Sequence, residues 1–348
     1  MTEEKENIKD IILEKDKIID IDSFLSKKPI TYPSKHAFDG QRYATNIKIL
    51  KNGNILFVNE LKYSTDDSYG SDFDESYIEI YNNDLTKLIS QLEIKSYDEI
   101  FLLKNDTIYL RSKGDIYDIS NSQFNKIGTV ENKFSNLFVP KNGKNYFNGR
   151  YDYKSNNFSI EILDENLKII KTLDFGKVHV YLRHCNNILE LSDKNKNIIS
   201  VLFLAGKIIF YDIKENKQIK SIDIYDKMNN EFNNAYSYDN VIEKNGQLYF
   251  CVYGEIIVIN LYNLQKQFSI KLKEGQFCQC VYDLNKDNIL LTLDKNIYAI
   301  YSKNNKMSKI LENDDIGNPI RFEKVNDNSF MLITSKGVFY YNIKYNYK

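Results

Sequence analysis

Residues 206–225 have the sequence "GKIIFYDIKENKQIKSIDIY". Two runs rich in Ile, Phe and Tyr flank the polar segment "KENK", as expected for two β-strands joined by a tight turn. The first run ends with the pair Tyr211-Asp212, an apolar or aromatic residue followed by a small polar one. The stretch therefore predicts a β-hairpin, and this pair is a marker with which to search for others.

Equivalent pairs end β-rich runs along the whole chain. They are Tyr81-Asn82, Tyr117-Asp118, Leu163-Asp164, Tyr211-Asp212, Ile259-Asn260, Tyr301-Ser302 and Tyr341-Asn342. Their second members are 36, 46, 48, 48, 42 and 40 residues apart, a mean of about 43, which is the period of a four-stranded propeller blade.

Further short apolar runs accompany each marked run. The first repeat reads "TNIKIL", "NILFV", "YIEIY", "KLISQLEI", and the sixth reads "CVYDL", "NILLTL", "NIYAIY", "MSKIL". Ile, Val, Tyr and Phe dominate these runs, as half-buried strands require. No segment between residues 45 and 345 requires a helix. The sequence therefore predicts an all-β fold, a seven-bladed β-propeller of four-stranded antiparallel blades.

Three positions resemble a known family. Phe210-Tyr211-Asp212 stands where a Trp-Asp signature would lie, His184 precedes the strand "ILEL" where a Gly-His dipeptide is usual, and Asp294 occupies a turn between second and third strands. In these features the chain resembles the WD-repeat β-propellers over nearly its whole length. No blade carries the full His, Asp, Ser/Thr and Trp network, and the Phe-Arg-Arg-Gly motif of phosphoinositide-binding propellers is absent. The resemblance therefore concerns the architecture and not a subfamily.

The seventh repeat lacks its outer strand, because only "IKYNYK" follows Asn342. An unpaired strand edge is a liability that proteins usually remove. We expect "KIIDID", residues 17–22, to pair beside residues 338–343 and close the ring, as WD-repeat propellers commonly do. A competing interpretation is an amphipathic helix over residues 3–21, and the two coexist if only residues 3–15 are helical. The expected organisation is an N-terminal extension over 1–16, helical in that case, and a single propeller domain over 17–348.

Charge and cysteine content exclude several classes of function. The 47 basic and 48 acidic residues give a net charge of −1, so no global field attracts nucleic acid or an anionic membrane. The cysteines lack CxxC spacing and are interpreted as reduced thiols; they are Cys185, Cys251, Cys278 and Cys280. The N-terminal "MTEEKENIKD" is charged, and no 18-residue apolar run occurs. We expect a cytoplasmic or nuclear protein without a metal or cofactor.

Four long insertions are expected on one face of the propeller, where second strands lead to third strands and fourth strands lead to the next blade. They are residues 61–76, 151–157, 174–186 and 225–240. Their formal charges sum to −5, against −1 for the chain. Long loops on a rigid scaffold commonly carry function. We expect this acidic face to bind other proteins, including ones with a basic surface.

The candidate partner-binding residues lie in these insertions. The acidic segment "STDDSYGSDFDES", residues 64–76, lacks the order of ligands of an EF-hand. It remains either a hook for a basic partner, a phosphorylation site at Ser64 or Ser71, or a solvated loop. Tyrosines elsewhere are favoured interface anchors, with loop packing as the alternative. The candidates are Asp66, Asp67, Tyr69, Asp72, Phe73, Asp74, Glu75, Tyr151, Tyr153, Tyr181, Arg183, Tyr236 and Tyr238.

Catalytic motifs are absent from the sequence. In "KVHVYLRHC", residues 177–185, His179, Tyr181 and Arg183 share one side of an extended segment, but no carboxylate is fixed beside them in sequence. No nucleophile elbow, P-loop, GxGxxG or metal-ligand pair occurs. The preferred function is a non-catalytic protein-interaction platform, a scaffold subunit of a larger complex. The alternative is a propeller enzyme with a Tyr, His and Arg pocket at the central channel.

Overall fold

A computed structural model of the chain describes residues 8–19, 41–62, 75–94, 100–131, 133–134, 136–139, 144–178, 185–191, 197–203, 207–223, 241–252, 255–272, 278–285, 288–293, 296–311, 319–326, 329–334 and 338–347. The chain divides into two compact units. One comprises residues 1–100, 105–128 and 279–348, and the other comprises residues 101–104 and 129–278. Both consist of β-strands, and no helix occurs in the described ranges.

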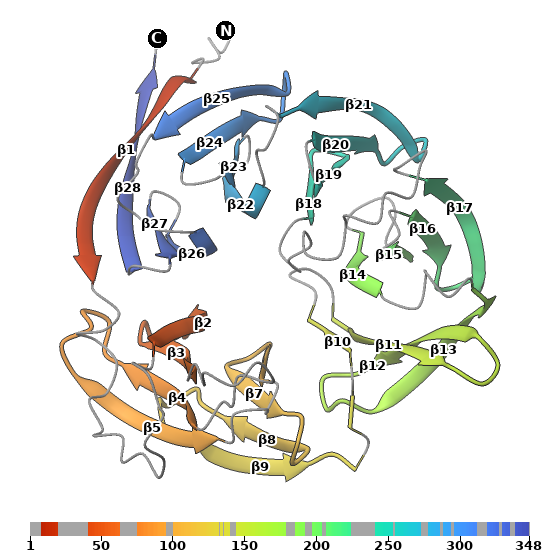
Figure 1. The fold of residues 1–348 in the computed structure, drawn as a ribbon, viewed down its shortest axis with the longest axis horizontal. Coiled ribbons are helices and arrows are strands. Elements are labelled where there is room, and N and C mark those ends of the chain that lie inside the picture. Colours follow the sequence, from red (N-terminus) through yellow and green to blue (C-terminus); the bar gives the residue numbers. More distant parts are fainter. Residues whose placement is uncertain are drawn as a thin grey trace, which may run out of the picture. The chain divides into compact units, whose positions relative to one another are not determined.

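Twenty-eight strands form seven four-stranded sheets (Figure 1). The first three are β2 (Gln41–Ile49), β3 (Ile55–Lys62), β4 (Glu75–Tyr81) and β5 (Leu88–Ile94); β6 (Ile100–Leu103), β7 (Thr107–Leu110), β8 (Asp115–Asp118) and β9 (Asn125–Thr129); and β10 (Leu137–Phe138), β11 (Tyr146–Asp152), β12 (Asn157–Leu163) and β13 (Ile169–Lys177).

The next three sheets repeat this order. They are β14 (Cys185–Glu190), β15 (Ile198–Phe203), β16 (Lys207–Asp212) and β17 (Lys217–Asp223); β18 (Val241–Lys244), β19 (Gln247–Val252), β20 (Glu255–Asn260) and β21 (Gln265–Lys271); and β22 (Cys278–Asn285), β23 (Asn288–Leu293), β24 (Asn296–Tyr301) and β25 (Lys306–Leu311). The predicted fold class, a seven-bladed β-propeller of antiparallel blades, is confirmed.

The seventh blade joins the two ends of the chain. Its first three strands are β26 (Pro319–Asn326), β27 (Ser329–Thr334) and β28 (Val338–Tyr347), and β1 (Ile8–Ile19) pairs antiparallel with β28. Closure by an N-terminal strand is therefore confirmed, but the strand begins well before residue 17. Residues 17–19 pair with Tyr340, Phe339 and Val338, whereas residues 20–22 lie outside the described ranges. The helical alternative does not hold for residues 8–15, which are extended.

The marker pairs end the third strands of blades one to six, and the structure shows why their second residue is polar. Side-chain oxygens of Asn82, Asp118, Asp164, Asp212 and Asn260 accept backbone N–H bonds of 2.8–2.9 Å from the turn that follows. Such Asx caps satisfy donors that a tight turn leaves unpaired. In blade seven the pair lies inside β28, because no turn follows there.

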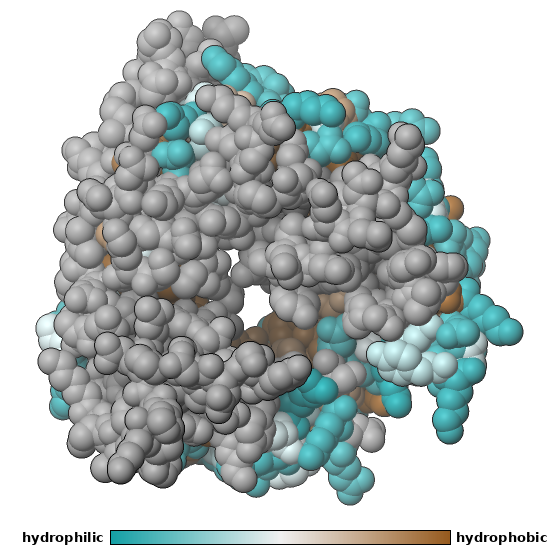
Figure 2. Space-filling view, in the orientation of Figure 1, coloured by the Kyte–Doolittle hydropathy of each residue, from teal (hydrophilic) through white to brown (hydrophobic). Residues whose placement is uncertain are grey.

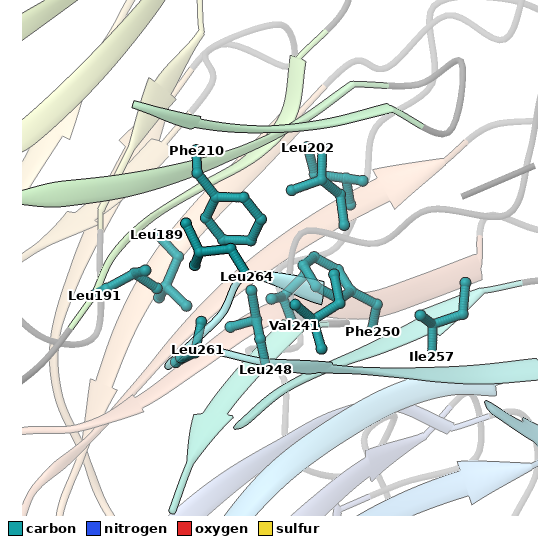
Figure 3. Close-up of a cluster of buried hydrophobic side chains, with 12 residues drawn as sticks. Leu189, Leu191, Leu202, Phe210, Val241, Leu248, Phe250, Ile257, Leu261 and Leu264 are labelled. Atoms are coloured by element: carbon teal, nitrogen blue, oxygen red, sulfur yellow. The ribbon is translucent and has the colours of Figure 1, made fainter. Parts of the chain in front are cut away.

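Apolar cores lie between successive blades within each unit. In the second unit, Ile209 and Tyr211 pack with blade-three residues such as Phe158 and Ile160. Phe210, between them in sequence, packs instead with Leu248 and other residues of blade five (Figure 3). The alternation of side chains along β16 thus serves two cores, which explains why this strand is apolar nearly throughout.

Candidate functional site

Most predicted partner-binding residues lie outside the described residues. They are Asp66, Asp67, Tyr69, Asp72, Phe73, Asp74, Tyr181, Arg183, Tyr236 and Tyr238. His179, His184 and Asp294, which the sequence analysis also singled out, lie outside the described residues as well. Glu75 is the first residue of β4 and pairs with Leu61. Tyr151 and Tyr153 are described, and they define the candidate site.

The site is the β11–β12 hairpin, residues 150–157, which links the second and third strands of blade three. The Asp152 carboxylate accepts the Lys154 N–H at 2.9 Å and the Ser155 hydroxyl at 2.5 Å. These bonds hold the pKa of Asp152 below its ordinary value, with the Ser155 hydroxyl as the larger cause. Asn156 donates its N–H to the Asp152 carbonyl at 2.8 Å and has a positive φ of 60°. The turn is therefore held by its own hydrogen bonds.

Two tyrosines of this hairpin form an edge-to-face pair. The ring centroids of Tyr151 and Tyr153 are 5.0 Å apart at an interplanar angle of 86°, a favoured geometry for aromatic side chains. Tyr151 packs against the core between blades three and four and donates its hydroxyl to Asn156 Oδ1 at 2.8 Å. Tyr153 is 70% exposed. A fixed tyrosine thus supports one that is open to solvent.

The neighbouring connection, from β13 toward blade four, is tied to the hairpin. Val178 donates its N–H to the Asn156 carbonyl at 3.0 Å, and Asp174 Oδ1 accepts the Gly176 N–H at 2.7 Å. Gly176 has a φ of 68°, a conformation that favours glycine. The hairpin and the end of β13 therefore form one continuous surface at the same end of blade three.

An arginine on β11 is oriented by a buried carboxylate. Arg150 donates from Nη1 to Glu161 Oε1 at 2.7 Å, and Asn148 donates to Glu161 Oε2 at 2.8 Å. The Glu161 side chain is 7% exposed, whereas that of Arg150 is 63% exposed. A buried carboxylate is costly unless it is paired and hydrogen-bonded. Here that pairing fixes a guanidinium group at the surface.

Blades one and two have an acidic residue at the third-strand position that Glu161 occupies in blade three. Glu79 accepts hydrogen bonds from Tyr81 at 3.2 Å and Gln91 at 3.1 Å, and Asp115 lies 2.8 Å from Lys126 Nζ. Blades four, five and six carry Ile209, Ile257 and Ala299 there. Since the partners differ from blade to blade, the position itself does not define a repeated binding site.

A cluster of ionisable groups in the second unit lies at the strand ends opposite to the β11–β12 hairpin. The Lys104 N–H donates to the Tyr146 hydroxyl at 3.0 Å, and Lys104 Nζ lies 5.5 Å from the Tyr146 ring centroid. Burial lowers the pKa of Lys104 and raises that of Glu190, and the attraction between the two opposes both shifts. Burial also raises the pKa of Tyr146. Oε2 of Glu190 is buried and has no hydrogen bond in the structure described. Sequence reasoning missed this cluster.

A second exposed tyrosine was also missed by the sequence analysis. Tyr262, in the turn between β20 and β21, is 72% exposed. A Cβ atom on Gly246 would lie 2.7 Å from its ring, so the glycine leaves room for the tyrosine. Tyr262 lies at the end of blade five opposite to the long connections, where no insertion signalled a site.

The described ranges contain neither a metal-binding cluster nor a membrane-spanning helix. No group of three or more His, Cys, Asp or Glu side chains there is arranged to hold a metal ion. Those ranges also contain no helix with the length and apolar character needed to cross a membrane. Cys185 is buried and free, and burial raises the pKa of its thiol.

Comparison with known proteins supports the fold. No protein-family model and no curated protein matches the chain. The crystal structure of BamB from Moraxella catarrhalis is similar with a TM-score of 0.56 and 8% sequence identity, over 95% of this chain and 100% of that one. In total 1447 solved chains match, so the fold is widely shared and does not select a function. The seven-bladed propeller is supported, whereas WD-repeat membership stays a prediction.

Proposed function

We propose that this protein is a non-catalytic protein-interaction platform, a WD-repeat-like scaffold subunit of a cytoplasmic complex. The proposal rests on the exposure of Tyr153. Its side chain is 70% exposed, and it lies at the tip of a hairpin that is held by its own hydrogen bonds. Tyrosine is enriched among residues that dominate binding energy, and a preorganised loop loses little entropy on binding.

The hydropathy of the surface is consistent with a partner that recognises a small number of residues. In Figure 2 the visible surface over the outer strands β17 and β21 is mainly hydrophilic, with small hydrophobic spots. Ile219 of β17 is 41% exposed. Interfaces that are not permanent are no more apolar overall than the remaining surface, and a few anchors provide most of their affinity.

Affinity purification of the tagged chain, followed by mass spectrometry, tests the proposal with two matched variants. Tyr153→Ala and Tyr262→Ala each remove a tyrosine of similar exposure, 70% and 72%, from opposite strand ends. We expect Tyr153→Ala to lose a partner that the unmodified chain and Tyr262→Ala both retain. Retention of every partner by Tyr153→Ala would contradict this assignment.

The predicted acidic loop is tested separately. Replacing Asp66, Asp67, Asp72, Asp74 and Glu75 by Asn or Gln removes five negative charges. We expect stability to change little, and association with a basic partner to slow and to depend less on salt, since exposed charges act mainly through steering. Unchanged association rates at two salt concentrations would remove these residues from the binding surface.

The enzyme alternative predicts a different response. Small-molecule binding to a pocket raises the melting temperature by mass action. A thermal-shift screen with metabolites and metal ions, run on the chain alone, is expected to give no stabilisation. A reproducible shift with a metabolite would favour the alternative.

A further inference from the structure

We infer that blade seven pairs edge to edge with a second copy of this chain, through residues 343–347 of β28. The inference goes beyond the proposed platform function and does not depend on it. It rests on a difference between blade seven and the other blades, at the end where a third strand normally turns into a fourth strand.

Blade seven ends in a two-stranded ribbon instead of a turn. β27 pairs with β28 only as far as Ser329, which lies opposite Asn342, whereas β1 pairs with β28 as far as Tyr347. In blades one to six the third strand ends at the marker pair, and the chain turns into the fourth strand. In blade seven β28 and β1 both continue, and we call residues 8–13 and 343–347 the ribbon.

The ribbon has one covered side and one open edge. β1 lies against β25 of blade six, and Ile343 is buried in the apolar cluster that joins blades six and seven. In Figure 1 the tip of the ribbon lies beside the end of β25, and β28 is on the side away from it. Among the described residues, no strand pairs with residues 343–347 on the side opposite to β1. This edge therefore offers backbone N–H and C=O groups to a further strand.

The sequence of this edge is complementary to itself. An antiparallel pair of edges centred on Tyr345 places this residue opposite Tyr345 of the second copy. Lys344 then lies opposite Asn346 of the second copy, and Ile343 lies opposite Tyr347. Aromatic and β-branched cross-strand pairs are favourable, and no like charges are opposed. A two-fold interface requires this property, because one segment must fit an identical one.

The pairing also keeps the two faces of the ribbon apart. Since Ile343 is buried against blade six, the alternation along β28 assigns positions 345 and 347 to the same face, and positions 344 and 346 to the other. In the two-fold pairing the odd positions of both copies fall on one face of the joined sheet. That sheet therefore has one apolar and one polar side.

The register of β1 extends the complementarity. Ile11 pairs with Tyr345, and Asp10 pairs with Asn346. Across the joined sheet β1–β28–β28–β1, one row therefore contains two isoleucines and two tyrosines, and Asp10 of each copy shares a row with Lys344 of the other. Opposite charges in one row favour this register. An unrelated strand also satisfies the backbone, but the sequence of the ribbon matches a second copy of itself.

The interface is small, because only residues 343–347 of each copy are paired across it. Interfaces that bury less than about 1,200 Å² are typical of weak or transient complexes. We therefore expect a dissociation constant of about 10–100 μM. The dimer forms at high protein concentration, and the monomer dominates when the protein is dilute.

Sedimentation velocity of the full chain gives the first test. Between about 5 and about 200 μM we expect a shift from monomer to dimer. Asn346→Lys opposes two lysines at two places in the dimer, but it faces Asp10 within its own chain. We expect it to weaken dimerisation about tenfold without lowering the melting temperature. The matched control is Gln218→Lys, which adds the same charge at an exposed position of the outer strand β17, and we expect its dimerisation to stay within about twofold.

Cysteine cross-linking tests the register itself. Tyr345→Cys sets two introduced thiols opposite each other, so mild oxidation is expected to link the copies through residue 345. In Lys344→Cys the two thiols lie diagonally, on residues about 7–8 Å apart, which is too far for a disulfide. A mixture of Lys344→Cys and Asn346→Cys is expected to link. Mass spectrometry assigns each link to the introduced cysteines, and the unmodified chain controls for the natural ones.

Several outcomes would overturn the inference. They are a chain that stays monomeric at about 200 μM, a dimer that is equally strong in Asn346→Lys and Gln218→Lys, and cross-links that do not follow the register centred on Tyr345. Partner capture through Tyr153 concerns a different blade. Failure of the dimer therefore leaves the platform proposal standing, and loss of the platform leaves the dimer standing.

Discussion

Replacing Ile209 by Ala measures whether β16 contributes to the core between blades three and four. Ile209 is 5% exposed and packs in the cluster that includes Phe158, Ile160 and Val201. The substitution removes three buried carbon groups, each worth about 0.8 kcal/mol in transfer free energy. Adding the cavity that remains, we expect a loss of about 3 kcal/mol, within the range of about 2–5 kcal/mol for such truncations.

The matched control is Ile219→Ala on β17 of the same blade, where the same atoms are removed from a side chain that is 41% exposed. We expect this change to cost less than about 1 kcal/mol. Urea denaturation followed by circular dichroism gives the global value, and hydrogen exchange of peptides from β16 gives the local one. Equal effects of the two substitutions, or a loss below about 0.5 kcal/mol for Ile209→Ala, would refute the placement of this strand.

Three further perturbations have defined outcomes. Deleting residues 1–22 removes β1 and bares the edge of β28, so we expect aggregation or a large fall in melting temperature, and a deletion variant as soluble and stable as the full chain contradicts this. Burial raises the pKa of Glu190 in the folded state above its ordinary 4.5, so the stability that this group contributes is complete below pH 4.5 and is lost as pH rises through the folded pKa. We therefore expect the melting temperature of Glu190→Gln to rise relative to that of the unmodified chain between acid and neutral pH. A difference in melting temperature that does not change with pH would refute the shift. Asp164 accepts two backbone N–H groups, whereas Asp212 accepts one. In urea denaturation we expect Asp164→Ala to lower the free energy of unfolding by about 1–2 kcal/mol, and by more than Asp212→Ala does. The reverse order would show that these caps do not determine the stability of the turns.

The blade pattern was predictable because it depends on local spacing. Marker pairs such as Tyr81-Asn82 and Ile259-Asn260 lie at strand ends, and apolar residues on both faces of β16 indicate a strand buried on both sides. The position of β1 was less predictable. Its isoleucines fit both a helical and an extended pattern, and the partner strand β28 decides between them.

The site depended on contacts that sequence spacing does not encode. Arg150 and Glu161 meet because the register of β11 and β12 brings them to one face of the sheet. Lys104 and Glu190 belong to different blades and interact only after the chain has folded. Tyr151 and Tyr153 were predicted from residue type and loop position, whereas their edge-to-face geometry required the structure.

The pairing of β1 with β28 has a consequence for synthesis of the protein. Ile19 precedes Val338 by 319 residues, so at about 5–20 residues per second the first strand waits roughly 15–60 s for its partner. During that time its isoleucine-rich sequence has no final partner strand, and blade seven stays incomplete. Any ribosome pause after the sixth blade prolongs this state, in which β1 has no strand to pair with until translation reaches β28.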